Sequence, residues 1–163
     1  MTNYFSTILV ATAMLMATAG AASAERIDRW DAQSFNGGAF ATDCRDCEED
    51  RGISIDCRVG KRMAEISIPG VSTEHGRKGR RTHVTLQVAG WKRVYRARMD
   101  YQGLIGYLPE FRISIDSPLF QRLSVGDTVL VKYQGQTSKF SLRGSARALK
   151  RFQRACRSGY AAR

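Results

Sequence analysis

Apolar side chains recur at every second position through much of the chain after residue 50. In the segment 53–59, Ile53, Ile55, Cys57 and Val59 alternate with polar residues, which is the period of a strand with one buried face. The same kind of pattern continues in the stretches 64–68, 83–88, 94–101, 111–116, 128–133 and 138–142. Short strands at this spacing predict a mainly β fold, an antiparallel β-sandwich or a partly open barrel.

Turn residues separate these stretches. Pro69-Gly70, Ala89-Gly90 and Gln134-Gly135 stand between neighbouring strands, where glycine and proline are favoured. The segment 119–127 predicts a short helical turn or loop. In the stretch 94–101 the alternation directs Arg96 and Arg98 outward and a second set of residues inward, namely Tyr95, Ala97, Met99 and Tyr101.

A C-terminal helix follows the last predicted strand. Gly144 ends the strand, and the Ser145 side chain is expected to cap the first free amides of the helix. The apolar residues at helical spacing predict one face packed on the sheet: Ala148, Leu149, Phe152, Ala155 and Cys156. Basic residues cover the other faces: Arg147, Lys150, Arg151, Arg154 and Arg157.

The first 24 residues carry no charged side chain and end in Ala22-Ser23-Ala24. This pattern predicts a secretory signal peptide over 1–24, cleaved after Ala24. An uncleaved anchor needs about 20 continuous apolar residues, and this run is shorter and rich in Ala and Thr. We therefore expect a single domain over 25–163 with no stable membrane insertion, located in the periplasm or secreted.

Four cysteines are available as cross-links: Cys44, Cys47, Cys57 and Cys156. An even number in an exported chain favours two disulfides, and three connectivities are possible. Cys44 and Cys47 are close enough in sequence to bond each other, although we favour pairing each with another cysteine. A bridge from Cys156 back to the region of Cys44, Cys47 and Cys57 would close a loop of roughly 100 residues. The chain-entropy model values such a loop at about 4 to 5 kcal/mol.

The stretch DCRDCEEDR, with its Cys44 and Cys47, also raises redox and metal chemistry. A reactive thiolate needs nearby positive charge or a helix amino terminus, whereas this motif is surrounded by carboxylates. Cys57 and Cys156 depart from the spacing of a zinc site. The acidic residues lack the ligand pattern and glycine of a calcium-binding EF-hand. Structural disulfides and a solvated acidic loop are therefore favoured, with no metal and no cofactor.

Catalysis has few candidate residues. His75 and His83 lie in or beside the basic run EHGRKGRRTH, and Glu74 beside His75 resembles an acid/base pair only in sequence. No G-x-S-x-G nucleophile motif is present, and Ser145 suits a helix cap better than a nucleophile. We predict that the protein is not an enzyme and has no catalytic residue.

Charge is the strongest functional signal. The formal net charge is +11 at pH 7, yet the region 25–50 carries −5, so the remainder carries +16. Such a field attracts polyanions and acidic proteins. One basic cluster surrounds the second predicted hairpin: Arg77, Lys78, Arg80, Arg81, Lys92, Arg93, Arg96 and Arg98. The other is the basic side of the C-terminal helix.

The region 117–152 resembles the closing part of the invasion-associated locus B family of periplasmic proteins. The residues that carry the resemblance are Leu123, Gly126, Leu130, Phe140, Leu142, Gly144, Ala148 and Leu149. The resemblance implies a strand that leads into a terminal helix, a bacterial envelope location and a part in host interaction, with no settled enzymatic activity.

These observations favour an exported, non-enzymatic envelope protein that binds an anionic envelope or host component, such as anionic polysaccharide, lipopolysaccharide or an acidic protein. Nucleic acid is not expected as a ligand, because export separates the protein from most cellular nucleic acid. The candidate contacts are Arg77, Lys78, Arg80, Arg81, Arg96 and Arg98, with a second patch of Arg147, Lys150, Arg151 and Arg154. The alternative is a periplasmic inhibitor or accessory subunit of a cell-wall hydrolase or other envelope enzyme.

Overall fold

The computed structural model describes residues 29–43, 52–58 and 61–158, so the predicted signal peptide, Cys44 and Cys47 lie outside the described residues. Nine strands are present in this part of the chain: β1 (Asp31–Phe35), β2 (Gly38–Thr42), β3 (Ser54–Arg58), β4 (Met63–Ser67), β5 (Arg81–Val88), β6 (Trp91–Tyr101), β7 (Tyr107–Ser114), β8 (Thr128–Tyr133) and β9 (Gln136–Ser141). The helices are α1 (Pro118–Val125) and α2 (Ser145–Ser158), with short 3₁₀ turns η1 (Pro69–Val71) and η2 (Gly103–Ile105).

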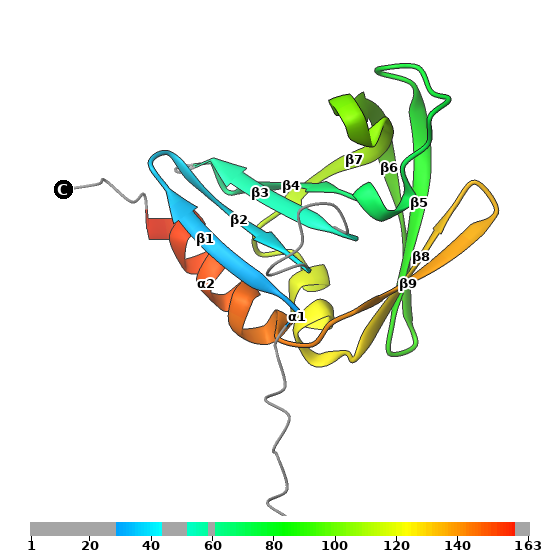
Figure 1. Ribbon diagram of the computed structural model, residues 1–163. Coiled ribbons are helices and arrows are strands. Elements are labelled where there is room, and N and C mark those ends of the chain that lie inside the picture. Colours follow the sequence, from blue (N-terminus) through cyan, green and yellow to red (C-terminus); the bar gives the residue numbers. More distant parts are fainter. Residues whose placement is uncertain (1–28, 44–51, 59–60, 159–163) are drawn as a thin grey trace, which may run out of the picture.

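The strands form one antiparallel sheet in the order β1-β2-β3-β4-β7-β6-β5-β8-β9. The sheet bends around the core without closing (Figure 1), which confirms the mainly β prediction in its partly open form. Trp30 connects its two edges just before β1, because its backbone N–H donates to the Arg143 carbonyl at 3.2 Å. Its indole Nε1 donates to the Ser141 carbonyl at 2.8 Å.

The predicted strands after residue 50 are present, and the alternating apolar residues are buried on one face of the sheet. One inward assignment is wrong: Tyr101 is 52% exposed, because β6 extends beyond the core at that end. The hairpin of β1 and β2 was not predicted. Its strands are short and rich in small residues, and its Asn36-Gly37 turn, with φ 99° at Gly37, was the available signal.

Helix α2 packs against β1, β2 and α1 with the predicted face inward. Leu149 and Phe152 are fully buried there. The expected capping role of Ser145 is not what the structure shows. Ser145 is the first helical residue, and its buried hydroxyl donates to the Leu123 carbonyl at 2.6 Å, which joins α2 to α1.

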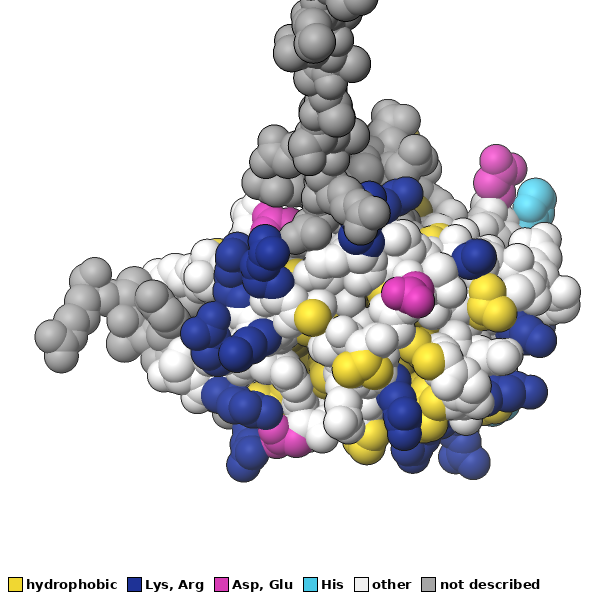
Figure 2. All heavy atoms as spheres, turned by 90° about the horizontal axis from the view of Figure 1, so that it is seen from below, with side chains coloured by type: hydrophobic (Ala, Val, Ile, Leu, Met, Phe, Trp, Pro, Cys, Tyr) yellow, Lys and Arg dark blue, Asp and Glu magenta, His cyan; other side chains and the backbone are white. Residues whose placement is uncertain are grey.

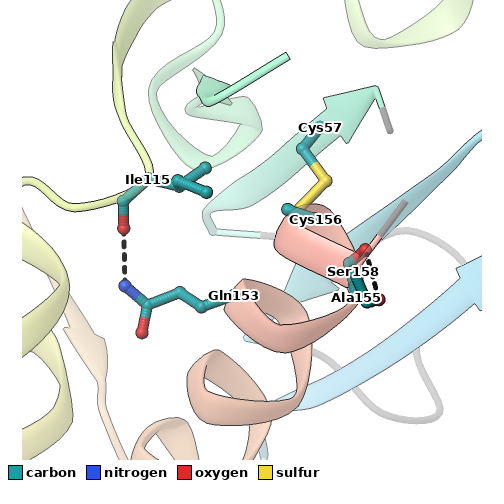
Figure 3. The surroundings of a disulfide bond; sticks show 6 residues. All are labelled: Cys57, Ile115, Gln153, Ala155, Cys156 and Ser158. Atoms are coloured by element: carbon teal, nitrogen blue, oxygen red, sulfur yellow. Dashed lines mark hydrogen bonds between the residues drawn. A yellow bond between two sulfur atoms is a disulfide. The ribbon is translucent and has the colours of Figure 1, made fainter. Parts of the chain in front are cut away.

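A disulfide between Cys57 on β3 and Cys156 on α2 fixes the far end of the helix (Figure 3), as the placement of Cys156 predicted. The two residues are 99 positions apart. Because both are occupied, the preference for pairing Cys44 or Cys47 with one of them is wrong. One turn earlier, the Gln153 side chain donates to the Ile115 carbonyl at 2.6 Å, so the helix is also attached to the segment after β7.

Candidate functional site

A basic surface lies on the outer face of the β5–β6 hairpin. Arg81 is the register partner of Arg98, and His83 is the partner of Arg96. All four are exposed, while Val84 and its alternating neighbours fill the core. Directly opposed side chains on paired strands are about 5 Å apart at Cβ, so the hairpin places these basic groups side by side.

The loop before β5 extends this surface. Its backbone continues the hairpin pairing, since the Gly79 N–H donates to the Met99 carbonyl at 2.8 Å and the Met99 N–H donates to the Arg80 carbonyl at 2.9 Å. Lys78 lies 3.3 Å from the Asp100 carboxylate. The structure therefore brings Arg81, Arg96 and Arg98 together on the outer face of the sheet. Arg77, Lys78 and Arg80 lie on the adjoining loop, and Arg80 alternates with Arg81 so that it starts from the opposite face. The six candidate contacts are hereafter the sheet patch: Arg77, Lys78, Arg80, Arg81, Arg96 and Arg98.

A hollow of about 370 Å³ borders the sheet patch where β6 and β7 separate. The β6–β7 ladder ends at Arg98 and Glu110, beyond which β7 pairs only with β4. Phe111 lines this opening, and its ring stacks on the buried ring of Tyr95 with centroids 4.5 Å apart. The residues that line the hollow are Glu65, Arg96, Arg98, Glu110, Phe111 and Arg112.

Two carboxylates offset part of the positive charge of this hollow. Glu65 forms an ion pair with Arg112 across β4 and β7. Glu110 accepts hydrogen bonds from Gln102 at 3.1 Å and Ser67 at 3.3 Å. Burial raises the pKa of the Glu110 carboxyl, and the negative charges of Glu65 and Asp100 raise it further. The site therefore combines arginines with a carboxylate that becomes neutral more readily than an ordinary glutamate.

A second, wider groove of about 570 Å³ adjoins the hollow at the Glu65–Arg112 ion pair, which lines both. Its walls include Arg58 and Lys61 together with two exposed apolar side chains, Phe35 and Met63. Neither Glu110 nor Arg112 was among the candidate residues from the sequence. Their place beside the basic hairpin depends on the pairing of β7 with β6 and β4, which no local pattern reveals.

The helix patch, Arg147, Lys150, Arg151 and Arg154, is exposed along α2. Figure 2 shows Lys and Arg side chains gathered in a row at this side of the molecule. Arg151 also has structural contacts, because its Nη1 donates to the Ala32 carbonyl at 3.2 Å and lies 3.5 Å from the Asp31 carboxylate. Four strands separate β1 from β6 in the sheet order, so the two patches are distinct surfaces.

Asp43 differs from the expected solvated acidic loop. It is 2% exposed, and its Oδ1 accepts hydrogen bonds from the Gly52 N–H at 2.8 Å and the Ile53 N–H at 3.0 Å. Burial raises the pKa of its carboxyl above the ordinary value, although these hydrogen bonds act in the opposite direction. Asp43 therefore joins the two ends of the 44–51 segment, and the rest of the acidic run lies outside the described residues.

The remaining chemical candidates do not converge. Glu74 and His75 are both exposed on a loop, while Ser145 is buried against α1. Among the side chains that the structure describes, no group of three or more His, Cys, Asp or Glu residues is arranged to hold a metal ion. Within the same ranges, no helix combines the length and apolar character needed to cross a bilayer.

The fold is similar to that of a solved protein, invasion associated protein B from Bartonella henselae. The TM-score is 0.50 at 14% sequence identity, over 77% of this chain and 92% of the other. This likeness is at the level of the fold. No family model matches the sequence, and no curated protein matches it.

Proposed function

We propose that this chain is a non-enzymatic protein of the bacterial envelope that binds an anionic envelope or host component through its basic surface. Its place of action is the periplasm or the cell exterior, where the Cys57–Cys156 disulfide is stable. The ligand is an anionic polysaccharide, the phosphates of lipopolysaccharide or an acidic protein face. The fold shared with invasion associated protein B supports an envelope role.

The observation that carries this proposal is the register of the β5–β6 hairpin. Arg81 faces Arg98, and Arg96 follows on the same face. Like charges directly opposite each other on paired strands destabilise a sheet. An anion bound across the pair removes that repulsion, so these arginines suit a ligand better than they suit the stability of the free protein.

The hollow beside this hairpin has the size and chemistry for a phosphate, sulfate or carboxylate group. A guanidinium presents a planar set of donors that matches these groups in bidentate geometry. Arg96 and Arg98 line the hollow, whereas the third arginine there, Arg112, is already paired with Glu65. An entering anion would compete with Glu65 for Arg112, which limits affinity for any single small anion and favours a polyanion that spans several arginines.

The proposal is tested by recovering partners from envelope and host-surface extracts on the immobilised, oxidised protein across a salt series. Anion binding should weaken steeply as salt rises. The variant changes Arg77, Lys78, Arg80 and Arg81 to Ser, and it should fail to retain the ligand at low salt. A control, Lys139→Ser with Arg143→Ser, removes exposed charges near β9 and should bind almost as the parent protein does.

One result of this experiment would contradict the proposal. A single protein that is retained in stoichiometric amount at high salt, and equally by the Ser variant, would contradict polyanion binding. That outcome would instead support the inhibitor or accessory-subunit alternative.

A further inference from the structure

An exposed apolar tip projects at the end of the sheet where β6 turns into β7. It consists of Tyr101, Leu104 and Ile105. Leu104 is fully exposed, while Tyr101 and Ile105 are 52% and 42% exposed. None of these three side chains belongs to the core of the described fold. Large apolar side chains grouped at one exposed turn are typical of surfaces that meet an apolar partner.

Backbone hydrogen bonds connect the tip to the rest of the fold. The Gln102 N–H donates to the Gly106 carbonyl at 2.9 Å, which closes the turn η2. Thr73 and Tyr107 exchange backbone hydrogen bonds at 2.8 and 2.9 Å, and the Tyr107 ring lies 5.1 Å from the ring of Tyr101. Gly106 has a φ of 86°, and a Cβ there would lie 2.8 Å from the Thr73 carbonyl oxygen. The tip is thus anchored to the loop before β5.

That loop carries the positive charges Arg77, Lys78 and Arg80 of the sheet patch. It is attached to the end of β6 through the Gly79–Met99 and Met99–Arg80 backbone hydrogen bonds. The Lys78 ammonium lies beside Asp100, the residue before Tyr101. Figure 1 shows η2 and the loop before β5 at the same end of the molecule. Apolar, aromatic and basic groups therefore stand together at one end.

We propose that this end of the protein docks reversibly on the surface of a lipid bilayer that contains anionic phospholipid. Leu104 and Ile105 enter the boundary between headgroups and acyl chains, Tyr101 stays at headgroup level, and Arg77, Lys78 and Arg80 contact the negative headgroups. Interfacial binding of this kind draws on buried apolar area together with attraction to anionic lipid. The contact is peripheral and involves no membrane span.

The inference deepens the proposed function and rests on it, because it names the anionic component that the sheet patch meets. A bilayer fits the tip better than a polysaccharide does, since a glycan offers no apolar interior for Leu104. Attraction to anionic lipid alone would not distinguish this end from the other basic surfaces of the protein. The specific observation is that the fully exposed leucine is adjacent to the basic loop.

The test is co-sedimentation of the purified, oxidised protein with vesicles of phosphatidylcholine, with or without phosphatidylglycerol. We expect binding only to the anionic vesicles. Leu104→Ser with Ile105→Ser should weaken that binding roughly tenfold or more. Neutralising Arg77, Lys78 and Arg80 should weaken it on the order of 100-fold. The matched control is Val125→Ser, which removes an exposed apolar side chain (69% exposed) on a different element, the helix α1.

A second readout reports insertion directly. A tryptophan introduced as Leu104→Trp should shift its fluorescence to the blue on anionic vesicles and be quenched by brominated acyl chains, whereas Val125→Trp should show neither effect. Unchanged unfolding midpoints would confirm that all of these surface variants remain folded. If Leu104→Trp is not quenched, or if the Ser variant of the tip binds vesicles as well as the parent, the docking proposal is wrong.

The two proposals can fail separately. Heparin, a sulfated polysaccharide, serves as a probe without a bilayer. If the parent protein binds heparin but not anionic vesicles, the tip proposal fails and the proposed function stands. If it binds neither probe, both fail. Loss of vesicle binding with intact heparin binding in the tip variant supports both. If the immobilised protein retains a partner protein only when Leu104 is present, and binds no vesicles, the tip contacts a protein and the bilayer proposal is wrong.

Discussion

Arg81 on β5 and Arg98 on β6 lie directly opposite each other in the hairpin register and are exposed on the same face of the sheet. Replacing Arg81 with Thr should therefore raise the free energy of unfolding by about 0.2 to 1 kcal/mol, most clearly at low salt. Chemical denaturation measures this change. Arg112→Thr is the control, because it breaks an ion pair with Glu65 and should change stability in the opposite direction. Destabilisation by Arg81→Thr would refute the repulsion.

Glu110 makes the hollow sensitive to pH. The pKa of its carboxyl is raised above 4.5 by burial first and then by Glu65 and Asp100. As pH falls through this raised pKa, the site loses a negative charge beside Arg98, so affinity for an anion should increase. Because the folded pKa exceeds the unfolded one, the stability contribution of this group is present below the unfolded pKa and is lost as pH rises through the folded pKa.

The variant Glu110→Gln tests both statements. At neutral pH it should bind heparin more tightly than the parent protein and unfold at higher denaturant concentration, since it resembles the neutral form of the carboxyl. The increase in affinity on acidification should become smaller. If parent and variant bind heparin with the same affinity at every pH, Glu110 is not part of the site.

The Cys57–Cys156 disulfide should dominate the stability of the domain. It closes a loop of 99 residues, for which the chain-entropy model gives about 4 to 5 kcal/mol. Replacing both cysteines with Ser should lower the free energy of unfolding by about this amount, as measured by urea unfolding under non-reducing conditions. Treatment of the parent with reductant should give a similar loss. A midpoint that is insensitive to both changes would show that the bond contributes little.

Asp43 joins the two ends of the 44–51 segment through the Gly52 and Ile53 amides. Asp43→Ala leaves these buried N–H groups without their acceptor and should cost about 2 to 4 kcal/mol of stability. Asp43→Asn keeps an acceptor oxygen and should retain most of the parent stability. Since burial raises the pKa of Asp43, the Asn variant should also show a flatter loss of stability as pH rises above 3.8. Equal destabilisation by Ala and Asn would show that the negative charge itself is required.

Much of the fold was predictable because strand and helix periods are local properties. The alternation of Val84, Leu86 and Val88 fixed one face of β5, and the spacing of Leu149, Phe152 and Cys156 fixed one face of α2. The hairpin of β1 and β2 was missed, since Ala39 and Ala41 are small and give a weak alternation. Tyr101 was placed inward because its period continues from Met99, although the core ends before it.

The candidate site was predictable only in part. Arg81, Arg96 and Arg98 belong to one hairpin, so their proximity follows from the Ala89-Gly90 turn. Arg112 and Glu110 come from β7, whose neighbours β6 and β4 are joined by non-local pairing. The hollow exists because β6 pairs with β7 only from Arg98 to Tyr101. Alternation within a strand does not show where its pairing with a neighbouring strand ends. Asp43 was expected in solvent because its neighbours in sequence are acidic, whereas its surroundings in space are buried backbone amides.

The central claim is that opposed arginines of the β5–β6 hairpin bind polyanions. The most direct measurement is the equilibrium affinity for heparin across a salt series, for the parent, for Arg81→Ser with Arg98→Ser, and for the control Lys139→Ser with Arg143→Ser. The account predicts that only the hairpin variant loses affinity strongly, with a salt slope smaller by roughly 1 to 2. Equal losses in both double variants would show that net charge alone drives binding, and would contradict a site at Arg81 and Arg98.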